Sequence, residues 1–272
     1  MIGRRGLYFS RFFPGGRVTA IASRTVPICA AGSPLATAIP HLLTGYRALP
    51  VVEKGRLAGM VSATDVLSYL GAGEKHRAFV ADRPLEAPVR AVMEPATAID
   101  AAASLRQAFS VFKTHRRGSH PVVARGRVVG MVADRDFLRG LRGTVGVRVE
   151  EIMTPRPAHV KESMPIADVA NVMVRAGYRR LPVTKGGIVT GIVVPSDLLS
   201  HLVAGERFPL HLETAPIAKV MVREVRTIRP GVDVVEAVNA MLRYRVGGLP
   251  VTEDHELLGI ITGSDVVQAM IA

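Results

Sequence analysis

Four stretches of the chain share one pattern of apolar and polar positions. Each begins with a proline inside an apolar run, passes a short polar turn, and continues from a glycine into a second apolar run. Two β-branched runs about a short turn predict a β-hairpin. An aspartate follows, and apolar residues then recur at helical spacing, as Val66, Leu67 and Leu70 do in the first stretch. This spacing predicts a helix directly after each hairpin.

The spacing of three positions is constant in all four stretches. Glycine follows proline by nine residues, and aspartate follows it by fifteen. Three constant positions in four copies indicate an internal repeat. The four sets are Pro50, Gly59 and Asp65; Pro121, Gly130 and Asp136; Pro182, Gly191 and Asp197; and Pro250, Gly259 and Asp265.

A second helix is predicted before each hairpin. In the fourth repeat Val234, Val235, Val238, Met241 and Leu242 share one helical face. Each repeat therefore predicts the order strand, helix, strand, strand, helix, which is an α+β fold. One such unit of about 50 residues buries too little surface to be stable alone, so we expect the units to pair. Residues suited to a helix start precede the four prolines by seventeen positions: Ser33, Ser104, Pro165 and Asp233.

These residues resemble the CBS domain family, which carries Leu-Pro-Val, then Gly with two apolar residues, then Ser/Thr-x-x-Asp. The resemblance covers about residues 25 to 270 and implies four units at about 25–70, 93–141, 153–202 and 221–270. It implies two Bateman modules, residues 25–142 and 143–272, after a basic N-terminal extension at 1–24. Closure into a pseudo-symmetric disk is also implied, as in the γ subunit of AMP-activated protein kinase and stand-alone archaeal relatives.

The resemblance also implies where an adenosine ligand would bind. In the family the last Asp of the motif binds the ribose hydroxyls, and the Ser/Thr residues before it contact phosphate. Repeats one and four have the full set, whereas repeat two has Ala133 and Arg135 and repeat three has Val194 at hydroxyl positions. We therefore expect the best sites at Asp65 and Asp265. The ribose candidates are Asp65, Asp136, Asp197 and Asp265, and the hydroxyl candidates are Ser62, Thr64, Ser196, Thr262 and Ser264.

Arginines stand just before two of the hairpins. Arg47 precedes Leu49, and Arg179 and Arg180 precede Leu181. The resemblance implies that they reach phosphates, and guanidinium groups suit bidentate phosphate contact. A structural alternative for the aspartate motif stays open, because Ser/Thr-x-x-Asp is also a helix capping box.

Charge and composition leave alternatives for the partner. The net charge of +12 attracts polyanions, among them nucleotides, nucleic acids and acidic proteins. Arginines and aromatic residues fill the first 24 residues, which we interpret as a poorly constrained extension, with a transit peptide or a phosphate-binding arm as alternatives. No nucleic-acid-binding motif accompanies the charge. Zinc, phosphate-loop and dinucleotide motifs are also absent, and the repeats fill nearly the whole chain, which argues against an enzyme.

The resemblance therefore implies a non-catalytic sensor of cellular energy state. AMP, ADP or ATP would bind in clefts between paired units and signal to an unidentified partner protein. There are two alternatives to this nucleotide ligand. One is an S-adenosylmethionine-type ligand, and the other is nucleic acid held by the basic N-terminal arm. Cys29 is the single cysteine and no apolar run is long enough to span a membrane, so we expect a cytoplasmic location. Scarce Asn and Gln favour a thermophile. No metal or cofactor is expected. The chain could also form a homodimer, and the sequence leaves this alternative open.

Overall fold

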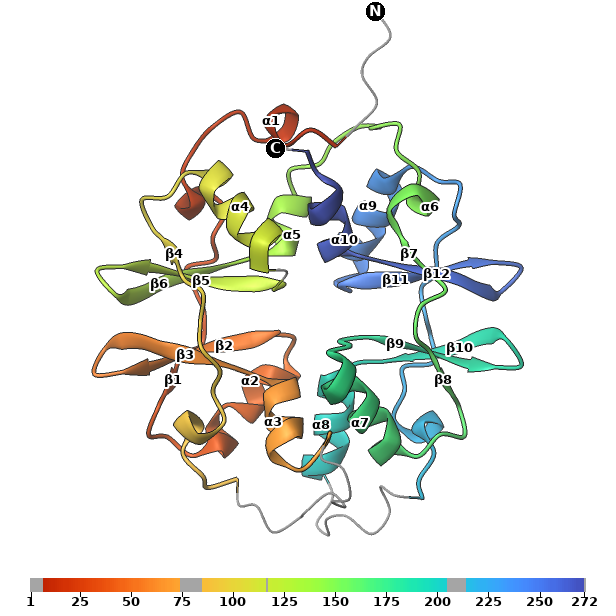
Figure 1. Ribbon diagram of the computed structural model, residues 1–272, viewed down its shortest axis with the longest axis horizontal. Helices are drawn as coiled ribbons and strands as arrows, with labels where there is room; N and C mark the ends of the chain where they lie inside the picture. Colours follow the sequence, from red (N-terminus) through yellow and green to blue (C-terminus); the bar gives the residue numbers. More distant parts are fainter. Residues whose placement is uncertain (1–6, 74–84, 116, 205–213, 272) are drawn as a thin grey trace, which may run out of the picture. The chain divides into compact units, whose positions relative to one another are not determined.

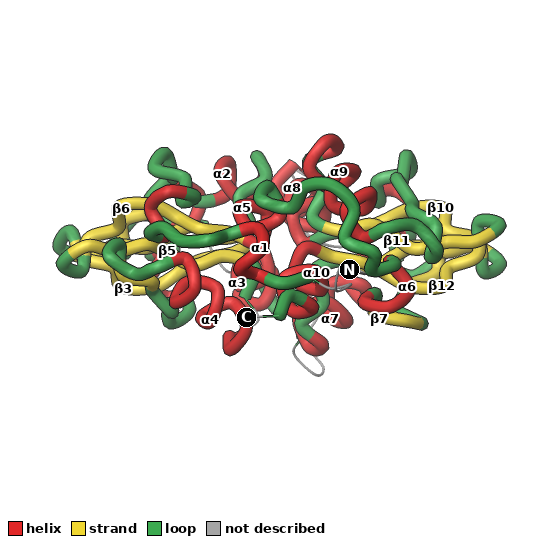
Figure 2. The backbone as a smooth tube through the Cα atoms, turned by 90° about the horizontal axis from the view of Figure 1, so that it is seen from above, coloured by secondary structure: helices red, strands yellow, loops and turns green. Residues whose placement is uncertain are grey.

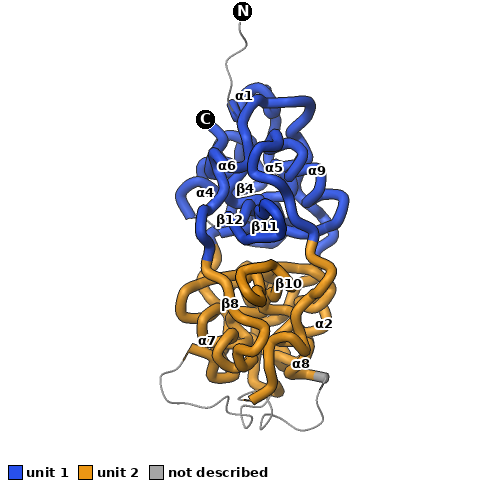
Figure 3. The backbone as a smooth tube through the Cα atoms, turned by 90° about the vertical axis from the view of Figure 1, so that its right-hand side faces the viewer, with its two compact units in different colours: residues 1–26, 97–157, 226–272 blue, residues 27–96, 158–225 orange. Residues whose placement is uncertain are grey.

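The computed structural model describes residues 7–73, 85–115, 117–204 and 214–271. The chain divides into two compact units, coloured separately in Figure 3. Unit 1 comprises residues 1–26, 97–157 and 226–272, and unit 2 comprises residues 27–96 and 158–225. The hairpins of repeats two and four therefore lie in unit 1, and those of repeats one and three lie in unit 2.

Unit 2 is built from two copies of the predicted order (Figure 1). Short 3₁₀ turns, η3 (Val89–Ala91) and η4 (Ile217–Lys219), come from the segments that open repeats two and four. Repeat one contains β1 (Cys29–Ala30), η2 (Leu35–Thr37), α2 (Ile39–Leu43), β2 (Ala48–Glu53), β3 (Arg56–Ser62) and α3 (Ala63–Tyr69). Repeat three contains β8 (Val160–Lys161), α7 (Ile166–Ala176), β9 (Leu181–Lys185), β10 (Ile188–Val193) and α8 (Pro195–Ala204).

Unit 1 follows the same order, and Figure 2 shows its hairpins and helices in separate colours. Before repeat two lie α1 (Phe9–Phe12) and η1 (Val18–Ala20). Repeat two contains β4 (Ile99–Asp100), α4 (Leu105–His115), β5 (Ser119–Ala124), β6 (Arg127–Ala133) and α5 (Asp134–Leu138). The remainder comprises α6 (Val149–Ile152), β7 (Thr154–Pro155), α9 (Val234–Tyr244), β11 (Gly248–Glu253), β12 (Glu256–Thr262) and α10 (Gly263–Ala269).

The predicted element order is confirmed, with two local differences. The first strand of repeat four is reduced to a single bridge between Ile228 and Val251. In repeat one the helix expected after Ser33 is broken into η2 and α2. Pro40 accounts for the break, because its ring removes an N–H donor and clashes with the preceding turn. The other three predicted starts directly precede α4, α7 and α9.

The constant glycine of each repeat lies where a neighbouring segment crosses the hairpin. At Gly59 a Cβ atom would lie 2.8 Å from the carbonyl oxygen of Glu94, and at Gly130 it would lie 2.7 Å from that of Ser23. Both carbonyls belong to opening segments of the adjacent repeat, which pair as the bridges Met60–Glu94 and Ser23–Met131. Only glycine permits backbones to approach so closely.

Consecutive repeats therefore exchange their opening segments. The same exchange joins repeats three and four, since β7 pairs with β12 and Val222 pairs with Ile192. The predicted modules at 25–142 and 143–272 join these same consecutive repeats. Their boundaries, and the closure into a disk, stay predictions.

Each compact unit has its own hydrophobic core. In unit 2 the helix α3 packs against α7 and α8, and Leu67, Val169 and Leu199 are fully buried. In unit 1 the helix α10 packs against α4, α5 and α9, with Phe109, Phe137 and Val266 buried. Each core thus takes side chains from two repeats, in keeping with the small surface that a single repeat can bury.

The N-terminal segment belongs to the core of unit 1. Leu7, Phe9, Phe13 and Val18 are each less than one-tenth exposed. The backbone N–H of Phe9 donates to the carbonyl of Ile271 over 2.7 Å, which ties the segment to the C-terminal end. The interpretation of the first 24 residues as poorly constrained is therefore wrong for residues 7–24. The rings of Phe9 and Phe13 are buried in this core, which the interpretation as an extension did not foresee, and residues 1–6 lie outside the described residues.

One histidine lies in the core of unit 1. His120 is 1% exposed, and its Nδ1 lies 2.9 Å from the carbonyl oxygen of Thr97. Among the described residues its Nε2 has no hydrogen-bond partner. Burial lowers the pKa of His120 below the usual 6.5, and the charges of His115 and Arg117 lower it further, against opposing effects of Thr97 and Asp134. The ring therefore stays neutral inside the fold at neutral pH.

Replacing His120 by leucine is expected to reduce the loss of stability in mild acid. The unfolded histidine takes up a proton near pH 6.5 and the buried one only at lower pH, so this residue's contribution is complete above 6.5 and is lost as pH falls. Leucine occupies the matching position in the other repeats, at Leu49, Leu181 and Leu249. Urea unfolding at pH 7.5 and pH 5 should show the wild type losing about 1 kcal/mol more than His120→Leu. An equal loss in both would contradict this account, and His41→Leu at an exposed position is the control.

Candidate functional site

The motif aspartates of repeats one and four lie in matching capping boxes. The backbone N–H of Ser62 donates to Oδ2 of Asp65 over 2.7 Å, and its hydroxyl donates to the same oxygen over 2.8 Å. Thr262 and Asp265 repeat this arrangement, with both distances at 2.7 Å. In return, each Asp backbone N–H donates to the hydroxyl oxygen over 3.3 Å. Each carboxylate is thus held at the corner between a strand and a helix.

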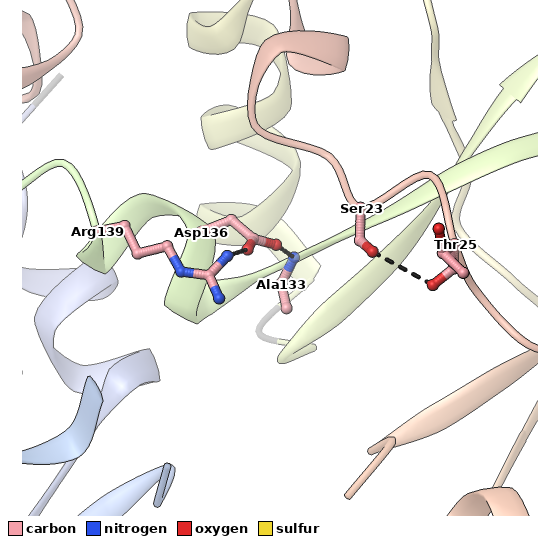
Figure 4. A network of polar contacts seen from close by, with 5 residues as sticks. All are labelled: Ser23, Thr25, Ala133, Asp136 and Arg139. Carbon is pink, nitrogen blue, oxygen red and sulfur yellow. Dashed lines mark hydrogen bonds and ion pairs between the residues drawn. The ribbon is translucent and has the colours of Figure 1, made fainter. Parts of the chain in front are cut away.

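Asp136 of repeat two is held without a hydroxyl (Figure 4). The backbone N–H of Ala133 donates to its Oδ2 over 2.8 Å, and Nη1 of Arg139 pairs with its Oδ1 at 2.8 Å. Asp136 is only 5% exposed. Burial raises the pKa of its carboxyl, while the Ala133 N–H and Arg139 act against that rise. Both carboxylate oxygens therefore already have protein partners.

Asp197 of repeat three has the fewest contacts of its own. The backbone N–H of Val194 donates to its Oδ2 over 2.9 Å, and no other partner of this carboxylate occurs among the described residues. Burial raises the pKa of Asp197, with only the Val194 hydrogen bond opposing it. A half-buried carboxylate with one oxygen open to donors is suited to accept ligand hydroxyls.

The capping role and the ligand role of the motif are compatible in geometry. In all four repeats Oδ2 of the aspartate accepts the backbone N–H three residues earlier, at 2.7 to 2.9 Å. The capping alternative is therefore real, and it orients each carboxylate in the same way. The ligand role of the four aspartates stays a prediction.

The expected phosphate-contacting hydroxyls differ in their surroundings. Ser62 and Thr262 donate to the motif carboxylates, so a phosphate contact would require each hydroxyl to rotate. Thr64 and Ser196 lie half-buried in the first turns of α3 and α8. Ser264 donates to Oδ2 of Asp134 over 3.0 Å, a contact between repeats four and two. Sequence reasoning missed Asp134, although the run Asp134-Arg135-Asp136 places an extra acid two residues before the motif aspartate.

All three candidate arginines lie in unit 2. Arg47 directly precedes β2 and is half-buried, while Arg179 and Arg180 directly precede β9, the first exposed and the second half-buried. The matching positions at the starts of β5 and β11 in unit 1 carry no charged side chain. They are Gly118, Ser119, Gly247 and Gly248.

A family model for the CBS domain matches residues 18–72, 89–143, 149–204 and 217–272. These matches include all four expected repeats and together span well over half of the chain. The chain therefore belongs to the CBS domain family, with four CBS units of α+β fold.

The most informative relatives are archaeal proteins of similar length. MJ1225 of Methanocaldococcus jannaschii is 28% identical over 82% of this chain and 87% of its own. Its crystal structure, described as that of a candidate archaeal homolog of γ-AMPK, matches 93% of this chain and 99% of that chain with a TM-score of 0.82. A 33.4 kDa protein from a ribosomal RNA operon of Thermofilum pendens is 30% identical over 81% of this chain and 79% of its own.

Metal-binding groups and membrane-spanning helices are both absent from the described residues. Within 7–73, 85–115, 117–204 and 214–271, no three His, Cys, Asp or Glu side chains gather in a group that could hold a metal ion. In the same ranges no helix has the length and apolar character needed to cross a bilayer. The cytoplasmic location and the thermophilic source stay predictions.

Proposed function

We propose that this protein is a non-catalytic sensor of adenosine nucleotides. AMP, ADP or ATP would place its ribose hydroxyls on a motif aspartate, with phosphates facing the arginines that precede β2 and β9. The single observation that carries this proposal is the shared carboxylate geometry. One oxygen of each aspartate is held by a backbone N–H at 2.7 to 2.9 Å, which fixes the direction in which the other oxygen faces.

The chemistry of the corner supports a cis-diol ligand. A carboxylate accepts O–H donors only, and a ribose presents two of them side by side. At Asp197 burial raises the pKa of the carboxyl, so ribose donors would favour the ionised form and compensate for the lost water. This observation makes Asp197 a stronger candidate than its incomplete hydroxyl set suggested, beside Asp65 and Asp265.

The output would be an altered contact with a partner protein. A ligand shifts an equilibrium only through different affinities for two states. The capped corners begin the helices α3, α8 and α10, which form much of each unit's core, so occupancy would change how firmly these helix starts are held. Membership of the CBS family and likeness to MJ1225 support regulation rather than catalysis, and the partner itself stays unidentified.

The binding test compares AMP, ADP, ATP and S-adenosylmethionine by isothermal titration against the wild type and Asp65→Asn with Asp265→Asn. Losing two charge-assisted acceptors is expected to weaken the summed binding of the preferred ligand at least about tenfold at those sites. Asparagine keeps the size of the side chain and an oxygen for the capping N–H. Asp168→Asn, at an exposed position in the first turn of α7, is the control.

Three outcomes decide the proposal. Tight nucleotide binding that the double variant weakens, and the control does not, would support it. Binding unaffected by the double variant would show that these two aspartates are not the ribose acceptors. Absence of binding for all four compounds would refute the sensor function.

A further inference from the structure

Two arginines contact one exposed tyrosine at the end of α9, the blue helix of unit 1 in Figure 1, and a third arginine follows it. The guanidinium carbon of Arg226 lies 4.7 Å from the centroid of the Tyr244 ring, and that of Arg243 lies 5.5 Å from it. Arg245 directly follows the tyrosine and is exposed. Tyr244 is 40% exposed, and Val246 is 39% exposed. We call these five residues, which all belong to unit 1, the α9 patch.

The arginines of the α9 patch have no acidic partner in the part of the chain that the structure describes. The ion pairs found there involve other arginines, as in the pair between Arg223 and Glu162. Glu224 stands two residues before Arg226 but forms no ion pair with it. Like charges close together repel one another, and an anion placed among them removes that repulsion. The patch is therefore a cationic surface that a negatively charged partner would neutralise.

The backbone of Arg245 is in a conformation that arginine seldom adopts. It ends α9 in the left-handed region, with φ 55° and ψ 32°. Glycine is usual at this place because it has no Cβ atom, and the matching residue after α7 is Gly177, with φ 69°. A cation near a helix C-terminus is favoured by the helix dipole, which explains Arg243 but not an arginine at a strained position. Strain of this kind persists mainly where a side chain has a role beyond folding.

The other repeats do not carry this set of side chains. In repeat three the matching residues at three of the places have no charge: Ala158, Ala176 and Gly177. The remaining match, Arg175, donates from Nε to the carbonyl oxygen of Gly73 over 2.8 Å, so it has a structural contact. Repeat one has no arginine at any of these places. Because the same fold forms without these side chains, packing does not require them in repeat four.

The surroundings of Tyr244 favour a protein partner over a nucleic acid. Proteins hold single-stranded nucleic acid by stacking its bases on aromatic faces, whereas guanidinium groups already lie over this ring. A stacked guanidinium still presents its N–H edge, which suits bidentate donation to a carboxylate. Val246 adds an exposed apolar contact that a protein side chain can cover. These features fit a short peptide segment that carries carboxylates beside an apolar residue.

We propose that the α9 patch is the docking surface for an acidic segment of a partner protein. Carboxylates of that segment would pair with Arg226, Arg243 and Arg245, and an apolar side chain between them would cover Val246. The inference deepens the proposed function and rests on it for the existence of a protein partner, because it states how that partner is recognised. The net charge of +12 would also draw an acidic segment toward the chain.

The binding test uses a fluorescein-labelled peptide with glutamates on both sides of one leucine, titrated against the full chain by fluorescence anisotropy at low salt. The comparison probes are the same peptide with glutamine for glutamate, and single-stranded oligothymidylate of the same net charge. We expect the wild type to bind the glutamate peptide at least about tenfold more tightly than the glutamine peptide.

The first variant removes two guanidinium groups from the patch. Arg226→Gln with Arg243→Gln is expected to weaken binding of the glutamate peptide at least about tenfold, because two charge pairs are lost. Arg106→Gln with Arg127→Gln is the control. It removes the same net charge from exposed positions on α4 and β6 of the same unit, and it should change the affinity less than about twofold.

A second variant separates docking from folding. Arg245→Gly relieves the left-handed strain, so we expect thermal unfolding at the wild-type midpoint or above it. The same change removes one guanidinium, and we expect the glutamate peptide to bind at least about threefold less tightly. A structural role alone would not combine kept stability with lost binding. Unfolding is followed by circular dichroism, and unchanged peptide binding in this variant would contradict the inference.

Three results overturn the inference. They are equal binding of the two peptides by the wild type, equal binding of the glutamate peptide by the Arg226 and Arg243 variant and its control, and tighter binding of the oligonucleotide than of the glutamate peptide.

Titration of AMP against the same proteins keeps the two proposals apart. If AMP binds and the glutamate peptide does not, the sensor function stands and only the docking surface fails. If the peptide binds as expected and AMP does not, the docking surface stands and the sensor function fails. If neither binds, both proposals fail.

Discussion

Replacing Phe9 by alanine is expected to lower the free energy of unfolding by about 3–5 kcal/mol, the usual cost of truncating a buried phenylalanine. Phe9 is 1% exposed. Its ring stacks on Phe109 with centroids 4.4 Å apart and on Phe13 at 4.9 Å. The cavity left by the ring would adjoin Phe137, which directly follows Asp136 on α5. Urea denaturation followed by circular dichroism measures the loss.

Phe12→Ala is the matched control, because it lies on the same short helix but is only half-buried. It is expected to cost about 1 kcal/mol or less, since little apolar area leaves water there on folding. If both variants lost the same free energy of unfolding, the segment 7–24 would contribute its helix to the fold but no side chain to the core. A loss confined to Phe9→Ala would show that the N-terminal segment is an integral part of unit 1.

Replacing Arg47, Arg179 and Arg180 together by alanine is expected to weaken AMP binding about 100-fold or more. A hydrogen bond to a charged group contributes about 1.5–3 kcal/mol, so losing the equivalent of two such contacts removes about 3 kcal/mol. Adenosine, which has no phosphate, is expected to bind the variant and the wild type with similar affinity. Isothermal titration with both compounds separates the phosphate contribution from that of the ribose.

Salt and a control variant sharpen this test. The AMP affinity of the wild type should fall as ionic strength rises, and the triple variant should show a weaker salt dependence, because fewer charge pairs are screened. Arg56→Ala removes an exposed arginine of β3 in the same unit and should change neither value. If adenosine binding falls as far as AMP binding, the three arginines support the fold of unit 2 rather than the phosphate.

Local sequence signals predicted the repeated elements well. The hairpins follow from β-branched runs and two-residue turns such as Lys54 and Gly55, which both adopt the positive φ angles that such turns require. The capping geometry follows from Ser62 and Asp65, three residues apart. Repeat one shows the limit of this reasoning, since a single proline at position 40 broke a helix that the repeat pattern predicted.

The candidate site was predicted only in part. The four aspartates and the three arginines could be named from the repeat pattern, and the structure places each aspartate at a capped corner. The grouping of the arginines in unit 2 could not be foreseen, because sequence order joins repeat one to repeat two, whereas the compact units combine repeats one and three. The motif could not predict that Asp136 and Asp197 have different contacts, since both residues occupy the same position in it.

The amino-acid sequence by itself determined four repeats, their hairpins, their helices and the position of each motif aspartate. Those features depend on turn-forming residues and on the periodicity of apolar positions within about 20 residues. Contacts between neighbours in sequence are enough to determine them. Tertiary structure alone decided that Phe9 enters the core of unit 1 and that Ser264 donates to Asp134, 130 positions away. Such contacts depend on which repeats pack together, and no local pattern encodes that choice.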